Sequence, residues 1–107
     1  MAFTGDEGDM IDPKYAQQMI DNYQKGEGPG STKAEFFGFR KLSQLLAQKN
    51  AIGLRIYYCK DDKGVDRMVV VAATPDEKNI GPIDGTTTDG LVLENGTKCP
   101  PYCNVTD

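Results

Sequence analysis

The chain has 107 residues, of which 38% are hydrophobic and 26% are charged, and this length and composition predict one soluble globular domain. Its formal net charge of −4 would repel a phosphate backbone, so we expect no nucleic-acid partner. No apolar run approaches the ~20 residues of a membrane-spanning helix, so we expect no membrane partner. The first nine residues show neither the basic start nor the apolar centre of a signal peptide. We therefore expect a cytoplasmic location, which argues against a structural disulfide.

Residues 1–9 are small, polar and acidic, and we expect a disordered tail there, followed by a single domain over residues 10–107. A helix is predicted near 13–25, because Asp12 is a good N-cap residue and Pro13 suits the first helical position. Its apolar side chains recur at helical spacing and form one stripe, made of Tyr15, Ala16, Met19, Ile20 and Tyr23. Such a stripe either packs on a sheet or binds a partner, and we interpret it as packed on the sheet.

The stretch from residue 33 to 49 allows two interpretations. Thr32 and Glu35 could form a capping box that starts one continuous helix. Alternatively, a short strand ends before Gly38, and a helix runs near 39–49. Gly38 would cost a continuous helix about 1 kcal/mol but is acceptable as a cap, so we favour the strand followed by the helix. Both interpretations place the apolar residues in the core, namely Phe36, Phe37, Phe39, Leu42, Leu45 and Leu46.

A β-hairpin is the predicted centre of the fold. Residues 51–59 alternate between apolar and other side chains, which is typical of a half-buried strand. A turn that ends at Gly64 follows, and the strand predicted over residues 67–74 is apolar on both faces from Met68 to Ala73, as in a central strand. A connection this short joins antiparallel neighbours.

The remainder of the chain is rich in turn residues. A brief strand is predicted at 91–93, followed by Asn95-Gly96, a tight-turn signal. Together the elements predict an α+β domain, in which a small antiparallel sheet centred on the hairpin (about 51–59 and 67–74) carries two packed helices (about 13–25 and 39–49).

No catalytic constellation stands out. The chain has no histidine, the commonest general base. Neither Ser31 nor Ser43 lies in a nucleophile-elbow context, and the carboxylate pairs fall in predicted turns. We assign no catalytic residue and no cofactor, and the sequence favours a non-catalytic protein.

The three cysteines are Cys59, Cys99 and Cys103, and the last two enclose Pro-Pro-Tyr. The terminal pair has three alternative fates. It could form a disulfide, it could bind a metal with Cys59 as third ligand, or it could remain as reduced thiols beside a proline turn that holds the carboxyl end. For a cytoplasmic chain we rank the reduced thiols first and the metal last.

Arg55 and Tyr57 are the candidate ligand-binding residues. They share one face of the predicted strand, and a guanidinium beside an aromatic ring could hold an anionic ligand in bidentate fashion. We favour the simpler interpretation, in which Arg55 faces solvent or pairs with a carboxylate across the sheet.

The strand Gly53-Leu54-Arg55-Ile56-Tyr57 and the closing Cys99-Pro100-Pro101-Tyr102-Cys103 resemble a family of small bacterial proteins of unassigned function. That family is marked by a G-I-R-I-Y strand and a terminal C-P-P-x-C motif. The strand here departs from the pattern at Leu54, and Cys59 lies outside it. The resemblance implies an α+β domain and brings no activity with it.

The sequence therefore predicts a small binding or interaction module without catalytic activity, whose partner is a protein or a small molecule. The alternative is a thiol-dependent redox or metal-handling protein that uses Cys99 and Cys103. The oligomeric state and the identity of the partner stay open.

Overall fold

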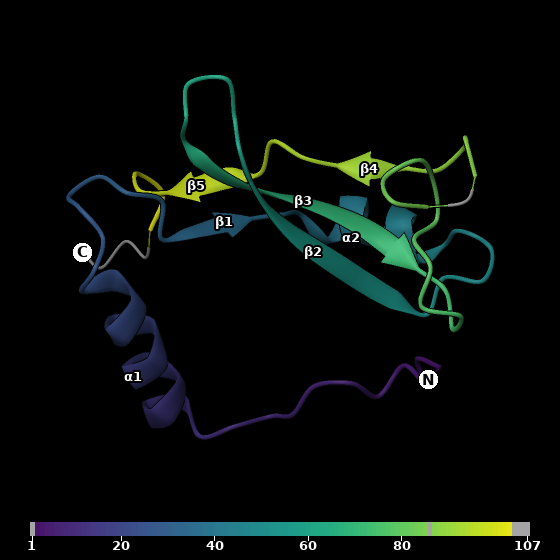
Figure 1. Cartoon of the computed structure of the whole chain (residues 1–107). Coiled ribbons are helices and arrows are strands. Elements are labelled where there is room, and N and C mark those ends of the chain that lie inside the picture. The colour runs from purple at the N-terminus through teal and green to yellow at the C-terminus, as the bar shows by residue number, and fades with distance from the viewer. Residues whose placement is uncertain (1, 86, 104–107) are drawn as a thin grey trace.

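Figure 1 shows the protein as a computed structural model, which describes residues 2–85 and 87–103. The predicted α+β class is confirmed, with two small antiparallel sheets in place of one. The elements in chain order are α1 (Pro13–Gln24), β1 (Ala34–Phe36), α2 (Phe39–Leu46), β2 (Gly53–Lys60), β3 (Asp66–Ala73), β4 (Val92–Leu93) and β5 (Thr97–Cys99).

The predicted hairpin forms the larger sheet, whose strand order is β2-β3-β4. β2 and β3 pair in register from Gly53 opposite Ala73 to Lys60 opposite Asp66. The turn is made by Asp61, whose Oδ1 accepts hydrogen bonds from two turn amides at 2.9 and 3.0 Å, and by a glycine at φ 79° (Gly64). β3 lies between two strands, as its apolar faces predict, and residues 70–73 are fully buried.

The smaller sheet pairs β1 with β5, and the sequence did not predict β5. Ala34 lies opposite Cys99, and Phe36 lies opposite Thr97. Asn95 has the positive φ of a tight turn, 60°. The strands on either side of that turn nevertheless join different sheets, so the turn carries the chain from β4 in the larger sheet to β5 in the smaller one.

The core lies between α2 and the larger sheet. Leu45 packs with Val70 and Ala72, and partly buried side chains surround them, among them Phe37, Leu42 and Leu54. Gly38 is the N-cap of α2, as the strand-then-helix interpretation requires, and the helix ends at Leu46, three residues before the predicted end. The core assignment was wrong for Phe36, Phe39 and Leu46, which are 69%, 70% and 46% exposed.

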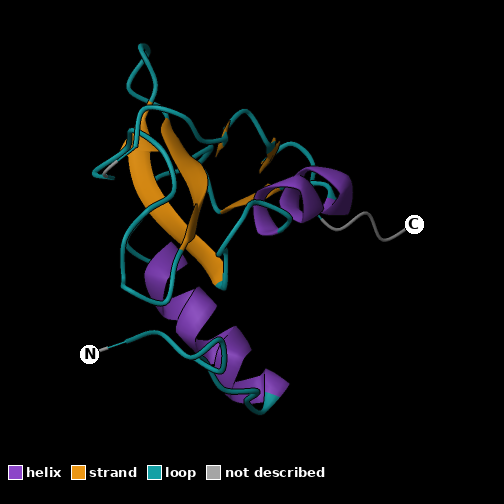
Figure 2. Ribbon diagram, turned by 90° about the vertical axis from the view of Figure 1, so that its right-hand side faces the viewer, coloured by secondary structure: helices purple, strands orange, loops and turns teal. Residues whose placement is uncertain are grey.

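Helix α1 begins as predicted but does not pack as predicted. The Asp12 carboxylate accepts a hydrogen bond from the Lys14 amide, and Pro13 occupies the first turn. No α1 residue is buried, and its four large apolar side chains, Tyr15, Met19, Ile20 and Tyr23, are 48–58% exposed. Packing of this stripe on the sheet was therefore the wrong interpretation. Figures 1 and 2 show the reason: α2 lies against the larger sheet, whereas α1 stands to one side of it.

Residues 2–9, for which the sequence predicts disorder, make specific contacts in the structure. The Phe3 amide donates to the Pro75 carbonyl at 2.8 Å. The guanidinium of Arg55 lies 5.3 Å from the centre of the Phe3 ring. Across the described part of the chain, neither helix is long and apolar enough to cross a membrane.

Candidate functional site

A buried carboxylate, that of Glu35, joins the two sheets. Its side chain is 0% exposed. Arg67 of β3 donates to it from Nη2 at 2.8 Å and from Nε at 3.3 Å, and the amides of Met68 and Gly96 donate at 3.0 and 2.9 Å. Arg67 Nη2 also donates to the Gly96 carbonyl at 3.0 Å. We call this group the Glu35 clamp, and it ties together β1, β3 and the turn that leads into β5.

The clamp requires a glycine at position 96. A Cβ there would lie 2.6 Å from the Phe36 carbonyl oxygen and 2.9 Å from Cε1 of Phe37, closer than real Cβ contacts allow. The sequence marks Gly96 as a turn residue and places Glu35 in the short strand before Gly38, or in a capping box under the alternative interpretation. Nothing in the sequence pattern indicates that the two meet, because the contact spans 61 residues.

The pKa of Glu35 follows from two opposing effects. Burial raises the pKa, but the hydrogen bonds and charge of Arg67, together with the Met68 and Gly96 amides, outweigh it and hold the pKa below its ordinary value. The same carboxylate raises the pKa of Arg67. Both side chains are therefore charged at neutral pH, and each is the main partner of the other.

Arg55 and Tyr57 are brought together by a residue that the sequence analysis missed, Asn79. Asn79 is 2% exposed; its Oδ1 accepts from Arg55 Nη1 at 2.7 Å, and its Nδ2 donates to the Tyr57 hydroxyl at 2.7 Å. Arg55 also donates to the Glu77 carbonyl at 3.3 and 3.4 Å. Val71 lies directly across the sheet from Arg55, so the residue opposite it in the ladder is apolar. Ligand binding at this pair stays a prediction, and the guanidinium already has acceptors within the protein.

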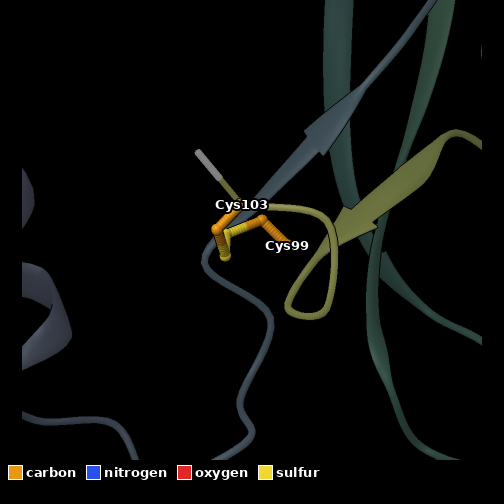
Figure 3. Close-up of a disulfide and its surroundings, with 2 residues drawn as sticks. All are labelled: Cys99 and Cys103. Atoms are coloured by element: carbon orange, nitrogen blue, oxygen red, sulfur yellow. A yellow bond between two sulfur atoms is a disulfide. The ribbon is translucent and has the colours of Figure 1, made fainter. Parts of the chain in front are cut away.

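The structure does not show the terminal cysteines as the reduced thiols that the sequence analysis ranked first. Cys99 and Cys103 form a disulfide, with their Cα atoms 4.6 Å apart, while Cys59 is a half-buried free thiol. Figure 3 shows the disulfide where β5 ends, beside the chain that enters β1. Among residues 2–85 and 87–103, no group of three cysteine or acidic side chains could hold a metal ion, and this includes the trio considered from the sequence.

A hollow in the described surface lies between α1 and the tip of the hairpin. Its volume is about 530 Å³, and we call it the α1 groove. Three segments line it, with apolar side chains beside several polar and charged ones: Met19, Ile20, Tyr23 and Gln24 from α1, Tyr58, Cys59, Asp66, Arg67 and Met68 from the hairpin, and Thr32, Lys33 and Ala34 from the entry to β1. The sequence did not predict this groove, because its walls come from segments far apart in the chain.

No protein family model, curated protein or solved structure matches this chain. The resemblance drawn from the G-L-R-I-Y strand and the C-P-P-Y-C end therefore stays a prediction. The functional argument depends on the geometry of the chain itself.

The Glu35 clamp predicts a specific pH dependence. Because folding lowers the pKa of Glu35, the ionised carboxylate contributes stability that is fully present above about pH 5 and is lost as the pH falls through the folded-state pKa. Glu35→Gln, which leaves the partly exposed Arg67 without its counter-charge, should lower the free energy of unfolding by about 2 kcal/mol at pH 7. Urea denaturation of both proteins from pH 7 to pH 3 should show this difference shrinking toward acid. A difference that stays constant over that range would contradict the assignment.

Proposed function

We propose that this protein is a non-catalytic interaction module that docks an apolar segment of a partner protein onto α1 and into the α1 groove. The observation that carries the proposal is the uncovered stripe of α1. Four large apolar side chains on three helical turns stay about half exposed. Contiguous exposed apolar surface of this kind typically marks a site of interaction.

The distribution of charge along α1 supports a partner segment with few charges where it meets this helix. At about 100° per residue, Lys14 and Asp21 of α1 and its C-cap residue Lys25 fall on the face opposite the stripe. The stripe itself carries aromatic, aliphatic and thioether side chains, which are enriched in protein interfaces. At the groove, Tyr58 is 86% exposed and extends the apolar surface onto the hairpin.

The size of the groove fits several side chains of a docked segment. Its volume of about 530 Å³ lies within the roughly 300–1,000 Å³ range of ligand sites, so a small molecule is the competing occupant. We favour the protein segment because the stripe continues beyond the groove along α1 to Tyr15, which a small ligand would leave uncovered. A cytoplasmic location remains part of this proposal.

Selection from a random peptide library tests the docking proposal. Peptides bound by the protein should be rich in apolar residues. Met19→Glu should weaken their binding at least tenfold, because it places a charge among the apolar side chains that α1 contributes to the groove. Gln18→Glu adds the same charge next to it, off the stripe, and should leave binding within about twofold. Equal affinity for the two variants, or a library without binders, would contradict the proposal. Light scattering of the free protein would detect self-association through the same surface.

A thiol-dependent redox or metal-handling protein is the second candidate, and the Cys99–Cys103 disulfide favours it. Disulfides in reducing compartments are mostly transient and catalytic or redox-sensing. Thiol titration at cytosolic redox poise, with metal analysis of the reduced protein, tests this candidate. Reversible gain of two thiols by reduction, or stoichiometric metal on the reduced pair, would support it. A disulfide that stays closed at that poise would contradict it.

A further inference from the structure

We infer that the redox state of Cys99 and Cys103 regulates the α1 groove, an inference that rests on the proposed docking function of that groove. The disulfide and the groove share a structural element. Lys33 and Ala34, which line the groove, pair with Cys99: Ala34 lies opposite it in the ladder, and the Lys33 amide donates to its carbonyl at 2.7 Å. A change at Cys99 is therefore transmitted directly to the groove wall.

The β1–β5 sheet, which carries this contact, is small enough to loosen when the disulfide is reduced. β1 and β5 have three residues each, and a two-stranded ribbon of this size is marginal without support. The Glu35 clamp holds one end of it, at Phe36 and Gly96. The disulfide closes the other end, where the Tyr102 amide also donates to the Lys98 carbonyl at 3.0 Å.

The disulfide is accessible to a reductant. Cys103 is exposed and Cys99 is half-buried. Reduction by a dithiol adds two electrons and two protons across the Sγ–Sγ bond and gives two thiols, while the dithiol becomes a disulfide. The turn from residue 100 to 103 is then free to leave β5, and the pairing of Cys99 with Lys33 and Ala34 loses its covalent support. The entry to β1 loosens, and with it the wall of the groove.

Hydrogen exchange measured by mass spectrometry tests this coupling on the full chain, oxidised and after reduction with dithiothreitol. Reduction should speed exchange over residues 33–36 about tenfold and leave residues 70–73 of β3, which are buried and lie outside the groove, unchanged. The double variant Cys99→Ser/Cys103→Ser should exchange like the reduced protein with or without dithiothreitol. Equal exchange over residues 33–36 in both states would overturn the inference.

Binding of a library-selected apolar peptide gives the second readout. Its affinity should fall about fivefold on reduction of the parent protein and should not change in the double serine variant. An affinity that is equal in the two redox states would overturn the regulation but leave docking intact. A failure to select any peptide would overturn the docking proposal, and the exchange experiment would still decide whether the disulfide and the groove wall are coupled.

Discussion

The carboxylate of Glu35 is the interaction on which the arrangement of the two sheets depends. A fully buried charge is strongly destabilising unless it is paired and hydrogen-bonded. Here a guanidinium and two main-chain amides meet it, and these donors come from β3 and from the turn before β5. The carboxylate can accept all of these hydrogen bonds only when β1, β3 and that turn adopt their observed positions. The hydrogen bonds of one side chain therefore determine how three segments lie relative to one another.

Two of the features that bear on function follow from this constraint. The entry to β1 forms a wall of the α1 groove, and the pairing of β1 with β5 brings Cys99 next to it. A second polar centre, at Asn79, performs a similar task on the other part of the larger sheet: it ties Arg55 and Tyr57 to the loop after β3. The apolar core beneath α2 supplies the hydrophobic stabilisation, whereas these polar groups determine which segments meet.

Local chemistry was enough to predict the hairpin and both helix starts. The alternation along β2, the glycine at the tip of the hairpin and the caps at Asp12 and Gly38 are all encoded within a few residues. The stripe of α1 was also recognised, but its packing was assigned wrongly. An amphipathic pattern indicates that one face of a helix is to be buried. It does not indicate whether this chain or a partner protein buries that face.

The remaining features depend on contacts between distant residues. β5 has three residues and no apolar alternation, so it exists because β1 pairs with it. Glu35 and Asn79 are ordinary polar residues in the sequence and become central only where the fold buries them. The disulfide was ranked below reduced thiols on the expected compartment, whereas its formation depends on the geometry of the turn between the two cysteines.

A double-mutant cycle between Glu35 and Arg67 tests the central claim most directly. The free energies of unfolding of the parent protein, Glu35→Gln, Arg67→Met and the double variant would be measured by urea denaturation at pH 7. The account predicts a coupling energy of about 2 kcal/mol, because the buried Glu35 carboxylate and the partly exposed Arg67 guanidinium are the main partners of each other. A coupling energy below about 0.5 kcal/mol would show that the two act independently and would contradict the clamp.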